Sequence, residues 1–257
     1  MLTFRNTNIF FASLLIFLIA INFHAHISVW LYIISVFIYS LVLFYGSYFI
    51  EAGFYIRSVC SAKINKKAIA ITFDDGPSEK FTSKILEVLK ENNVQASFFC
   101  IGNRIKENEN LLKKIHHEGH IIGNHSYSHH FWFDLFSAKK MLDDMQSTDI
   151  EVKKNIGLSP KLFRPPYGVT NPNVKKAILK GEYSSVGWNV RSMDTVAKDK
   201  NKLLQKLKTS IKPGAIILFH DTCNITLDIL PEFIQFVKAE GYEITRLDKM
   251  CNLQAYA

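Results

Sequence analysis

The stretch Ile69-Ala70-Ile71-Thr72-Phe73-Asp74-Asp75-Gly76-Pro77 decides the fold. An apolar, partly β-branched run of strand length ends in two adjacent carboxylates, and a Gly-Pro turn follows at once. Two ionised neighbours at the end of a buried strand repel each other and lose hydration. A metal ion, a basic partner or a shared proton can offset that cost. The simpler alternative is a strand followed by a turn in which Asp is the turn former.

Apolar runs of strand length alternate with segments of helical periodicity along the rest of the chain. The expected strands are Ala68–Phe73, Ala96–Ile101, His120–Gly123, Leu162–Arg164, Ser184–Asn189, Ala215–Phe219 and Glu243–Arg246. The expected helices include 137–156, 173–180, 200–210 and 227–240, the first, second and fourth of which end at glycines. This alternation is typical of a parallel sheet, and seven or eight such units can close into a barrel. We therefore expect an α/β fold, a (β/α) barrel with about seven parallel strands.

Two apolar blocks without Lys, Arg, Asp or Glu lie between Asn6 and Ile50. A membrane span needs about 20 apolar residues, which the second block provides and the first reaches with its flanks. We expect an N-terminal transmembrane helical hairpin over residues 1–55 and a catalytic domain over residues 67–250. A cleaved signal peptide is the competing interpretation of the first block, but no small-x-small cleavage site follows it.

The side of the membrane on which the barrel lies is open. Basic residues precede the first block and follow the second, so the positive-inside rule puts both ends of a hairpin in the cytoplasm. If only one block crosses, the barrel lies outside. The expected location is integral to a bacterial-type cytoplasmic membrane, with the side of the catalytic domain undetermined.

Composition limits the partners of the chain. A net charge of +8 in 257 residues is modest, and no basic run interleaved with aromatics suggests a nucleic-acid groove. The four cysteines, Cys60, Cys100, Cys223 and Cys251, have no paired spacing, so neither a zinc knuckle nor a disulfide framework is indicated. We expect no nucleic-acid partner and see no sign of an obligate protein partner.

Unusual polar residues cluster just after the expected strands, where the loops of a barrel converge on one face. They are Asp74 and Asp75 after the first strand, His125 and His129 after the third, Arg164 at the end of the fourth, Trp188 and Asp194 near the fifth, and His220 after the sixth. The spacing of His125 and His129 would place both imidazoles on one face of a helical turn. Two such imidazoles and Asp75 would leave a metal ion with open positions, as in catalytic sites.

A metal ion with open positions activates water, and hydrolysis of an acyl group then needs a base and an acid. Asp74 can be the base, because Asp75 is occupied by the metal, and His220 on the facing side of the rim can be the acid. Arg164 lies in the stiff segment Arg164-Pro165-Pro166-Tyr167-Gly168 and can pair with Asp74. The alternative for Arg164 is an ordinary exposed ion pair.

Four motifs in this order resemble those of the polysaccharide deacetylase family, the chitooligosaccharide-deacetylase-like carbohydrate esterases. The motifs are Thr-Phe-Asp-Asp-Gly-Pro, His-Ser-Tyr-Ser-His, Arg-Pro-Pro-Tyr-Gly and Leu218-Phe219-His220, and the similarity covers about residues 67–246. The resemblance implies a distorted (β/α) barrel that removes acetyl groups from N-acetylated sugars with a divalent metal, usually zinc.

The resemblance also implies roles for individual residues. Asp74 matches the family's base, Arg164 the residue that holds the base, and His220 the general acid. Asp75, His125 and His129 match the metal ligands. Tyr167 matches the residue whose backbone amide completes the oxyanion site, and Trp188 and Leu218 match the walls of the acetyl-methyl pocket.

One motif departs from the family pattern, which commonly has an Asp-Trp pair where this chain reads Arg191-Ser192-Met193-Asp194-Thr195. Asp194 is retained and can tune His220, but Thr195 replaces the aromatic residue. The expected substrate is a GlcNAc-containing glycan or a lipid-linked sugar. The alternatives are an O-acetyl polysaccharide esterase and a catalytically inactive, glycan-binding membrane protein.

Overall fold

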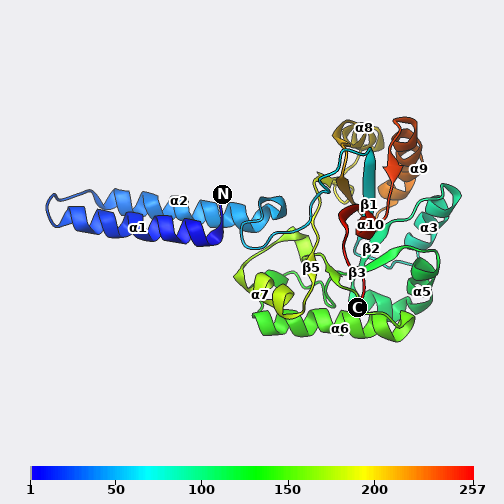
Figure 1. Ribbon diagram of the computed structural model, residues 1–257, viewed down its shortest axis with the longest axis horizontal. Coiled ribbons are helices and arrows are strands. Elements are labelled where there is room, and N and C mark those ends of the chain that lie inside the picture. The colour runs from blue at the N-terminus through cyan, green and yellow to red at the C-terminus, as the bar shows by residue number, and fades with distance from the viewer. Residues whose placement is uncertain (1) are drawn as a thin grey trace.

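The structure, a computed structural model, describes residues 2–257 and begins with two long apolar helices. Helices α1 (Phe4–Asn22) and α2 (Val29–Tyr48) lie side by side as an antiparallel hairpin that projects from the rest of the molecule (Figure 1). The Tyr39 hydroxyl of α2 donates a hydrogen bond of 2.9 Å to the Asn8 side chain of α1. Both helices are long and apolar enough to cross a membrane, and few of their residues are buried.

The remaining chain folds around one curled parallel sheet. Its strands are β1 (Ala68–Asp74), β2 (Ser97–Cys100), β3 (Ile121–Asn124), β4 (Leu162–Phe163), β5 (Ser184–Ser185), β6 (Val190–Arg191), β7 (Ala215–His220) and β8 (Glu243–Ile244). The order across the sheet is β5-β4-β3-β2-β1-β7-β6, and β8 pairs with the beginning of β1. All strand pairs are parallel, which confirms the predicted distorted (β/α) barrel.

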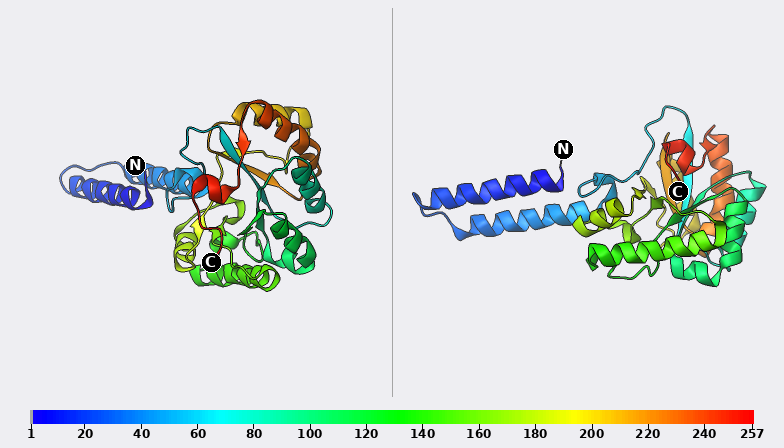
Figure 2. Two further views of the ribbon diagram at one scale, coloured as in Figure 1. Left: turned by 45° about the vertical axis from the view of Figure 1, so that its right-hand side comes forward. Right: turned by 60° about the horizontal axis from the view of Figure 1, so that its bottom comes forward.

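Helices cover the outer face of the sheet (Figure 2). The longer ones are α3 (Thr82–Glu91), α5 (Glu109–His117), α6 (Ala138–Ile156), α7 (Pro172–Lys180), α8 (Lys200–Ser210) and α9 (Asn224–Ala239). Shorter helical segments are η1 (Ile50–Ala52), α4 (Gly102–Glu107), η2 (Phe133–Leu135), η3 (Pro166–Gly168) and α10 (Leu247–Cys251). Each predicted helix is present, and α4 is an addition that the apolar pattern did not indicate.

The predicted strand 184–189 is wrong as one element, because the chain there changes neighbours. Ser184 and Ser185 pair with β4, whereas Val190 and Arg191 pair with β7 on the other side of the barrel. Between them, the Asn189 side chain accepts a hydrogen bond of 2.9 Å from the Ile216 amide of β7. An amide side chain that pairs with a neighbouring strand in this way interrupts the regular ladder, so one expected strand becomes two short ones.

The residues of β1 alternate between two environments, as side chains of a strand must. Ile69, Ile71 and Phe73 pack into the core between the sheet and the outer helices. Ala70 packs into a second core inside the curl of the sheet, together with residues of α10. The next inward positions are Thr72 and Asp74. Small and polar side chains on this inner face therefore leave room for the functional groups at the end of the strand.

The segment between the hairpin and β1 is part of the barrel rather than a free linker. The Val59 amide donates to the Ser185 carbonyl (2.8 Å), and the Val59 carbonyl accepts from the Gly187 amide (3.0 Å). Three residues later, the Ala62 amide donates to the Gly214 carbonyl before β7 (2.8 Å). The segment thus lies in the seam between β5 and the beginning of β7, and it holds the hairpin close to the barrel.

Gly214 provides a test of this seam. Its φ is +77°, and a Cβ atom there would lie 2.0 Å from the Ala62 carbonyl oxygen. We expect Gly214→Ala to lower the free energy of unfolding by roughly 2 kcal/mol or more, measured by thermal unfolding in detergent. Gly241→Ala is the matched control, because Gly241 has the same φ of +77° and nothing within 4 Å of a Cβ. An equal decrease in the free energy of unfolding for the two variants would show that the contact between Gly214 and Ala62 does not stabilise the fold.

Candidate active site

Polar side chains from the ends of four strands meet at one end of the barrel. Asp74, the last residue of β1, lies opposite His220 of β7 in the strand register. A cavity of about 170 Å³ opens here. It is lined by Asp74, Asp75, His125, His129, Tyr167, Gly168, Trp188, Arg191, Thr195, Leu218 and His220. The structure therefore brings together every residue singled out from the sequence, with Arg164 and Asp194 behind the lining.

Arg164 and Asp74 form a fully buried ion pair. The Arg164 Nη1 lies 2.6 Å from Asp74 Oδ1 and 2.9 Å from the Thr72 hydroxyl, and Nη2 donates to the Gly187 carbonyl at 2.9 Å. The guanidinium also lies over the Phe99 ring, 4.0 Å from its centroid. Burial lowers the pKa of Arg164, and the charge and hydrogen bond of Asp74 oppose that shift. The exposed ion pair considered as an alternative is excluded, because Arg164 has no exposed surface.

Asp75 points to the two histidines. Its Oδ1 lies 3.5 Å from His125 Nε2 and 3.4 Å from His129 Nε2, and one ligand atom from each of the three residues falls within 4.8 Å of the others. This Oδ1 is buried and has no hydrogen-bond partner among residues 2–257. Burial and the neighbouring His125 lower the pKa of His129 to about 4, so the imidazole is neutral at pH 7, as a metal ligand must be. An orphaned carboxylate oxygen between two imidazoles fits a divalent metal ion.

A loop, not a helical turn, brings the two histidines together, so the predicted helical spacing is wrong. Ser126 has φ of +67° and His129 of +43°, which no α-helix contains. The His129 amide donates to the Ser126 hydroxyl (3.0 Å), and the Tyr127 amide donates to Asp144 of α6 (2.6 Å). Side-chain acceptors for these amides stabilise a tight reversal that a helix would not need.

A hydrogen bond on the side of the ring away from Asp75 orients the imidazole of His125. Its Nδ1 lies 2.8 Å from the carbonyl oxygen of Arg164, so the ring nitrogen that faces Asp75 is Nε2. An Nδ1–H···O=C hydrogen bond fixes the tautomer in which Nε2 carries a lone pair. The backbone of Arg164 thus positions His125 while its side chain holds Asp74.

In the turn after β1, the side chain of Asp75 points away from the side chain of Asp74. Asp75 has φ of +77°, and Arg104 of α4 donates a hydrogen bond of 2.6 Å to its carbonyl oxygen. Gly76 has no room for a side chain, because a Cβ atom there would lie 2.0 Å from the carboxylate of buried Asp221. The residue after the two carboxylates must therefore be glycine.

His220 is held by Asp194 on the opposite side of the cavity. The His220 Nδ1 lies 2.7 Å from Asp194 Oδ1, and the His220 amide donates to Asp194 Oδ2, also at 2.7 Å. Thr226 of α9 donates a further hydrogen bond to Asp194. Burial alone would lower the pKa of His220, but the hydrogen bond and charge of Asp194, with smaller contributions from Asp74 and Asp75, raise it above 6.5.

Aromatic and aliphatic side chains close the cavity. Tyr167 has φ of +59°, which is unusual for a residue with a side chain and marks a constrained position. Its ring lies 4.8 Å from that of His129. A Cβ atom on Gly168 would lie 2.4 Å from the Trp188 ring, so Trp188 can close the wall only against glycine. Arg191 and Thr195, where the chain departs from the family pattern, also line the cavity.

Several supporting residues were not found from the sequence. They are Thr72, Arg104, Asp144 and Thr226, which contact Arg164, the Asp75 carbonyl, the histidine loop and Asp194 respectively. Of these four, Thr72 alone lies in a motif quoted from the sequence, and each of the four acts through a contact that is distant in the sequence. Only Thr72 carried a signal, as an inward polar position two residues before Asp74.

Comparison with known proteins identifies the family. Residues 61–186 match the family model described as polysaccharide deacetylase. A peptidoglycan-N-acetylglucosamine deacetylase of Bacillus cereus is 34% identical over 198 residues, which cover 74% of this chain and 70% of that protein. The peptidoglycan-N-acetylmuramic acid deacetylase PdaA of Bacillus subtilis is 34% identical over 189 residues, 72% of each chain.

Solved structures agree with the sequence matches. The Bc1960 peptidoglycan N-acetylglucosamine deacetylase is similar with a TM-score of 0.73 at 32% identity, covering 77% of this chain and 94% of that one. A CE4 family pseudoenzyme from Bacillus anthracis is also similar, with a TM-score of 0.67 at 28% identity over 73% of this chain and 66% of that one. The chain belongs to the polysaccharide deacetylase family and is a carbohydrate deacetylase.

Proposed function

We propose that this protein is a membrane-anchored, metal-dependent N-deacetylase of a GlcNAc-containing glycan. Residues 1–55 are the anchor and residues 67–250 the catalytic domain. The observation that carries the proposal is the partnerless buried Oδ1 of Asp75 between two imidazoles. The Asp74–Arg164 and His220–Asp194 pairs lie beside it at the same cavity.

Asp75, His125 and His129 would hold the metal. One carboxylate and two imidazoles suit zinc among the common divalent ions, and three protein ligands leave positions for water and substrate. When bound, such an ion lowers the pKa of water and polarises the acetyl carbonyl. Zinc is therefore the expected ion.

Asp74 is the proposed base. Its Oδ1 accepts a hydrogen bond of 2.6 Å from Arg164, and its Oδ2 lies on the side of His125, 3.8 Å from Nε2. From there Asp74 can accept the proton of an attacking water molecule. His220, kept protonated to higher pH by Asp194, can donate a proton to the departing sugar nitrogen. The base and the acid thus have different partners, a guanidinium for Asp74 and a carboxylate for His220.

The remaining cavity residues position the acetyl group. The backbone amide of Tyr167 is the proposed donor to the developing oxyanion, and the unusual φ of Tyr167 is the observation that favours a constrained, functional position. Trp188 and Leu218 would enclose the acetyl methyl group. A cavity of about 170 Å³ suits a small acyl group rather than a bulky one.

The sugar is inferred from the relatives. The two bacterial relatives are named as deacetylases of the N-acetylglucosamine and of the N-acetylmuramic acid of peptidoglycan. These two sugars are both N-acetylated and belong to one glycan. We propose N-acetylglucosamine, within a glycan or linked to a lipid. O-deacetylation remains the chemical alternative, because the same groups can attack an ester. An inactive glycan-binding protein is the second alternative, and the pseudoenzyme among the similar structures is the observation in its favour.

The hairpin is the proposed anchor in a bacterial-type cytoplasmic membrane. Its two ends lie at the barrel and its turn lies at the far end (Figure 1). If both helices cross, the barrel and the N-terminus lie on the same side, and the positive-inside rule places both in the cytoplasm. If only α2 crosses, the barrel faces a wall or exported glycan.

Acetate release tests the proposal. We expect the zinc-loaded protein in detergent to release acetate from N-acetylglucosamine oligosaccharides faster than from O-acetylated xylan. Asp74→Asn should lower the rate by about 10²-fold or more, because the amide cannot accept the proton. The variant should still bind zinc, because Asp75, His125 and His129 are unchanged, but it should unfold at a lower temperature, because buried Arg164 loses its charged partner. Equal release by Asp74→Asn would refute the role of Asp74, and zinc binding without any acetate release would favour the inactive alternative.

The pH dependence tests the pairing of His220 with Asp194. The raised pKa of His220 keeps its acid form at higher pH, so activity should fall as pH rises through that value. In Asp194→Asn, the charge of Asp194 no longer offsets the burial of His220, so the pKa of His220 should fall. The alkaline limb of the kcat–pH profile should therefore move to lower pH by about one pH unit or more. Thr226→Val is the control, because it leaves the His220–Asp194 hydrogen bond intact and should shift the limb less. An unmoved limb in Asp194→Asn would contradict the assignment of His220 as acid.

A further inference from the structure

The end of α2 is hydrogen-bonded to the loop that lines the cavity. The Thr170 amide donates to the Ser47 carbonyl at 3.1 Å, and the Thr170 hydroxyl donates to the Gly46 carbonyl at 3.3 Å. Thr170 is buried and follows Tyr167, a cavity residue, by only three positions. The mouth of the cavity is therefore attached directly to the end of a candidate membrane span.

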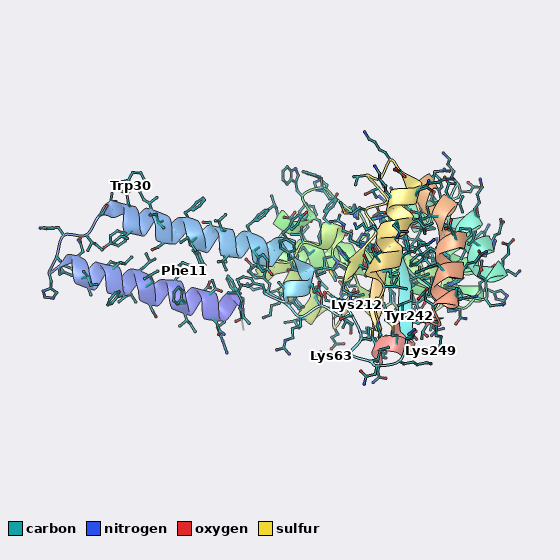
Figure 3. All side chains as sticks on the ribbon, turned by 90° about the horizontal axis from the view of Figure 1, so that it is seen from above. Phe11, Trp30, Lys63, Lys212, Tyr242 and Lys249 are labelled. Carbon is teal, nitrogen blue, oxygen red and sulfur yellow. The ribbon has the colours of Figure 1, made fainter. Side chains whose placement is uncertain are left out.

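Aromatic residues mark both ends of α2. Trp30 lies at the end far from the barrel (Figure 3), and Tyr48 is the last residue of the helix. Tyr48 follows Trp30 by 18 positions, so the two residues lie about 27 Å apart along the helix axis at 1.5 Å per residue. This distance is close to the ~30 Å thickness of the hydrocarbon core of a bilayer. Tyr and Trp favour the two interfaces of a bilayer. A bilayer around α2 would therefore place Ser47, and Thr170 that is hydrogen-bonded to it, at the level of the lipid headgroups.

An exposed apolar loop continues from this point. Phe131, Trp132 and Leu135 are 66%, 55% and 68% exposed. The Phe131 ring lies 4.6 Å from that of Trp132 and 6.2 Å from that of Tyr167 at the cavity. The Asn171 side chain, next to Thr170, donates a hydrogen bond of 2.6 Å to the Asp134 carbonyl within the loop. This loop, the cavity rim and the end of α2 thus form one connected surface.

Helix α7 adds basic charge to the same side of the barrel, next to the base of the hairpin (Figures 1 and 2). Val174, Ala177 and Ile178 face the core. The outward residues are Lys175, Lys176, Leu179 and Lys180, and Leu179 is 61% exposed. Acidic groups on this side include Asp134, which is half-buried, Glu182, which pairs with Lys161, and Glu51, which is exposed just after α2. Exposed apolar side chains beside lysines are the combination that binds an anionic bilayer.

We propose that this hairpin-side face, made of Phe131, Trp132, Leu135 and the outward residues of α7, rests on the bilayer surface as a second membrane contact. The acetyl cavity then opens at the level of the lipid headgroups. The consequence for the substrate rests on the proposed deacetylase function: the saccharide that reaches the cavity is one carried close to the bilayer, as on a glycolipid. Continuity with the hairpin is what favours a lipid surface over a sugar or a protein as the occupant.

Tryptophan quenching in vesicles tests the contact without any turnover. The full chain carrying Trp30→Phe is reconstituted into phosphatidylcholine–phosphatidylglycerol vesicles that contain lipids brominated near the headgroup end of the acyl chains. We expect the brominated lipids to quench Trp132 emission at least about twofold, as for an interfacial side chain, and the added change Trp132→Phe to remove the quenched component. Unquenched Trp132 emission overturns the proposal. A shift of Trp132 emission on addition of a soluble N-acetylglucosamine oligosaccharide, without quenching by the brominated lipids, also overturns it, because the loop would then be a sugar-binding surface.

Substrate choice tests the consequence. We expect Leu135→Asp to slow acetate release from an N-acetylglucosamine glycolipid in vesicles by about tenfold and to leave release from a soluble N-acetylglucosamine oligosaccharide in detergent unchanged. Ile150→Asp is the matched control. Ile150 is 66% exposed, like Leu135, but it lies about 18 Å along α6 from the first residue of that helix, away from the proposed membrane contact. Equal slowing on both substrates would contradict the inference. A protein that releases no acetate would refute the proposed function but leave the quenching result standing.

Discussion

The buried ion pair between Arg164 and Asp74 is the constraint on which the site depends. A guanidinium without exposed surface costs several kcal/mol unless its donors are paired. The chain supplies Asp74, the Thr72 hydroxyl and the Gly187 carbonyl, from β1 and from the segment between β5 and β6. Because Arg164 follows β4 directly, its contacts join the end of β1 to β4 and to the segment between β5 and β6.

Two neighbouring carboxylates receive different tasks from this arrangement. Asp74 still belongs to β1 and points inward to Arg164, with which it forms a buried ion pair. Asp75 lies just beyond the strand, and its positive φ turns the next carboxylate to the histidines. The repulsion expected between adjacent charges is relieved for Asp74 by the Arg164 guanidinium and would be relieved for Asp75 by the proposed metal ion. Gly76 is needed because Asp221 fills the space beside the turn.

Much of the fold could be predicted from the sequence, because strands such as β1 carry their own pattern of apolar and polar positions. The gathering of Asp75, His125 and His129 followed from one rule, that loops after parallel strands converge. The helical turn for the histidines was wrong because spacing alone does not distinguish a helix from a loop with positive φ at Ser126 and His129. Asp144, Arg104 and Thr226 could not be predicted, since each acts through a tertiary hydrogen bond with no local signal. The roles of the site residues stay predictions.

Anomalous diffraction at the zinc edge, from crystals of the zinc-loaded protein, would show which of Asp74 and Asp75 binds the metal. We expect one strong peak within about 2.2 Å of a carboxylate oxygen of Asp75 and of Nε2 of both His125 and His129. Asp74 should lie outside the coordination shell and remain paired with Arg164. A zinc ion bridged by both carboxylates, or bound away from the two histidines, would contradict the account.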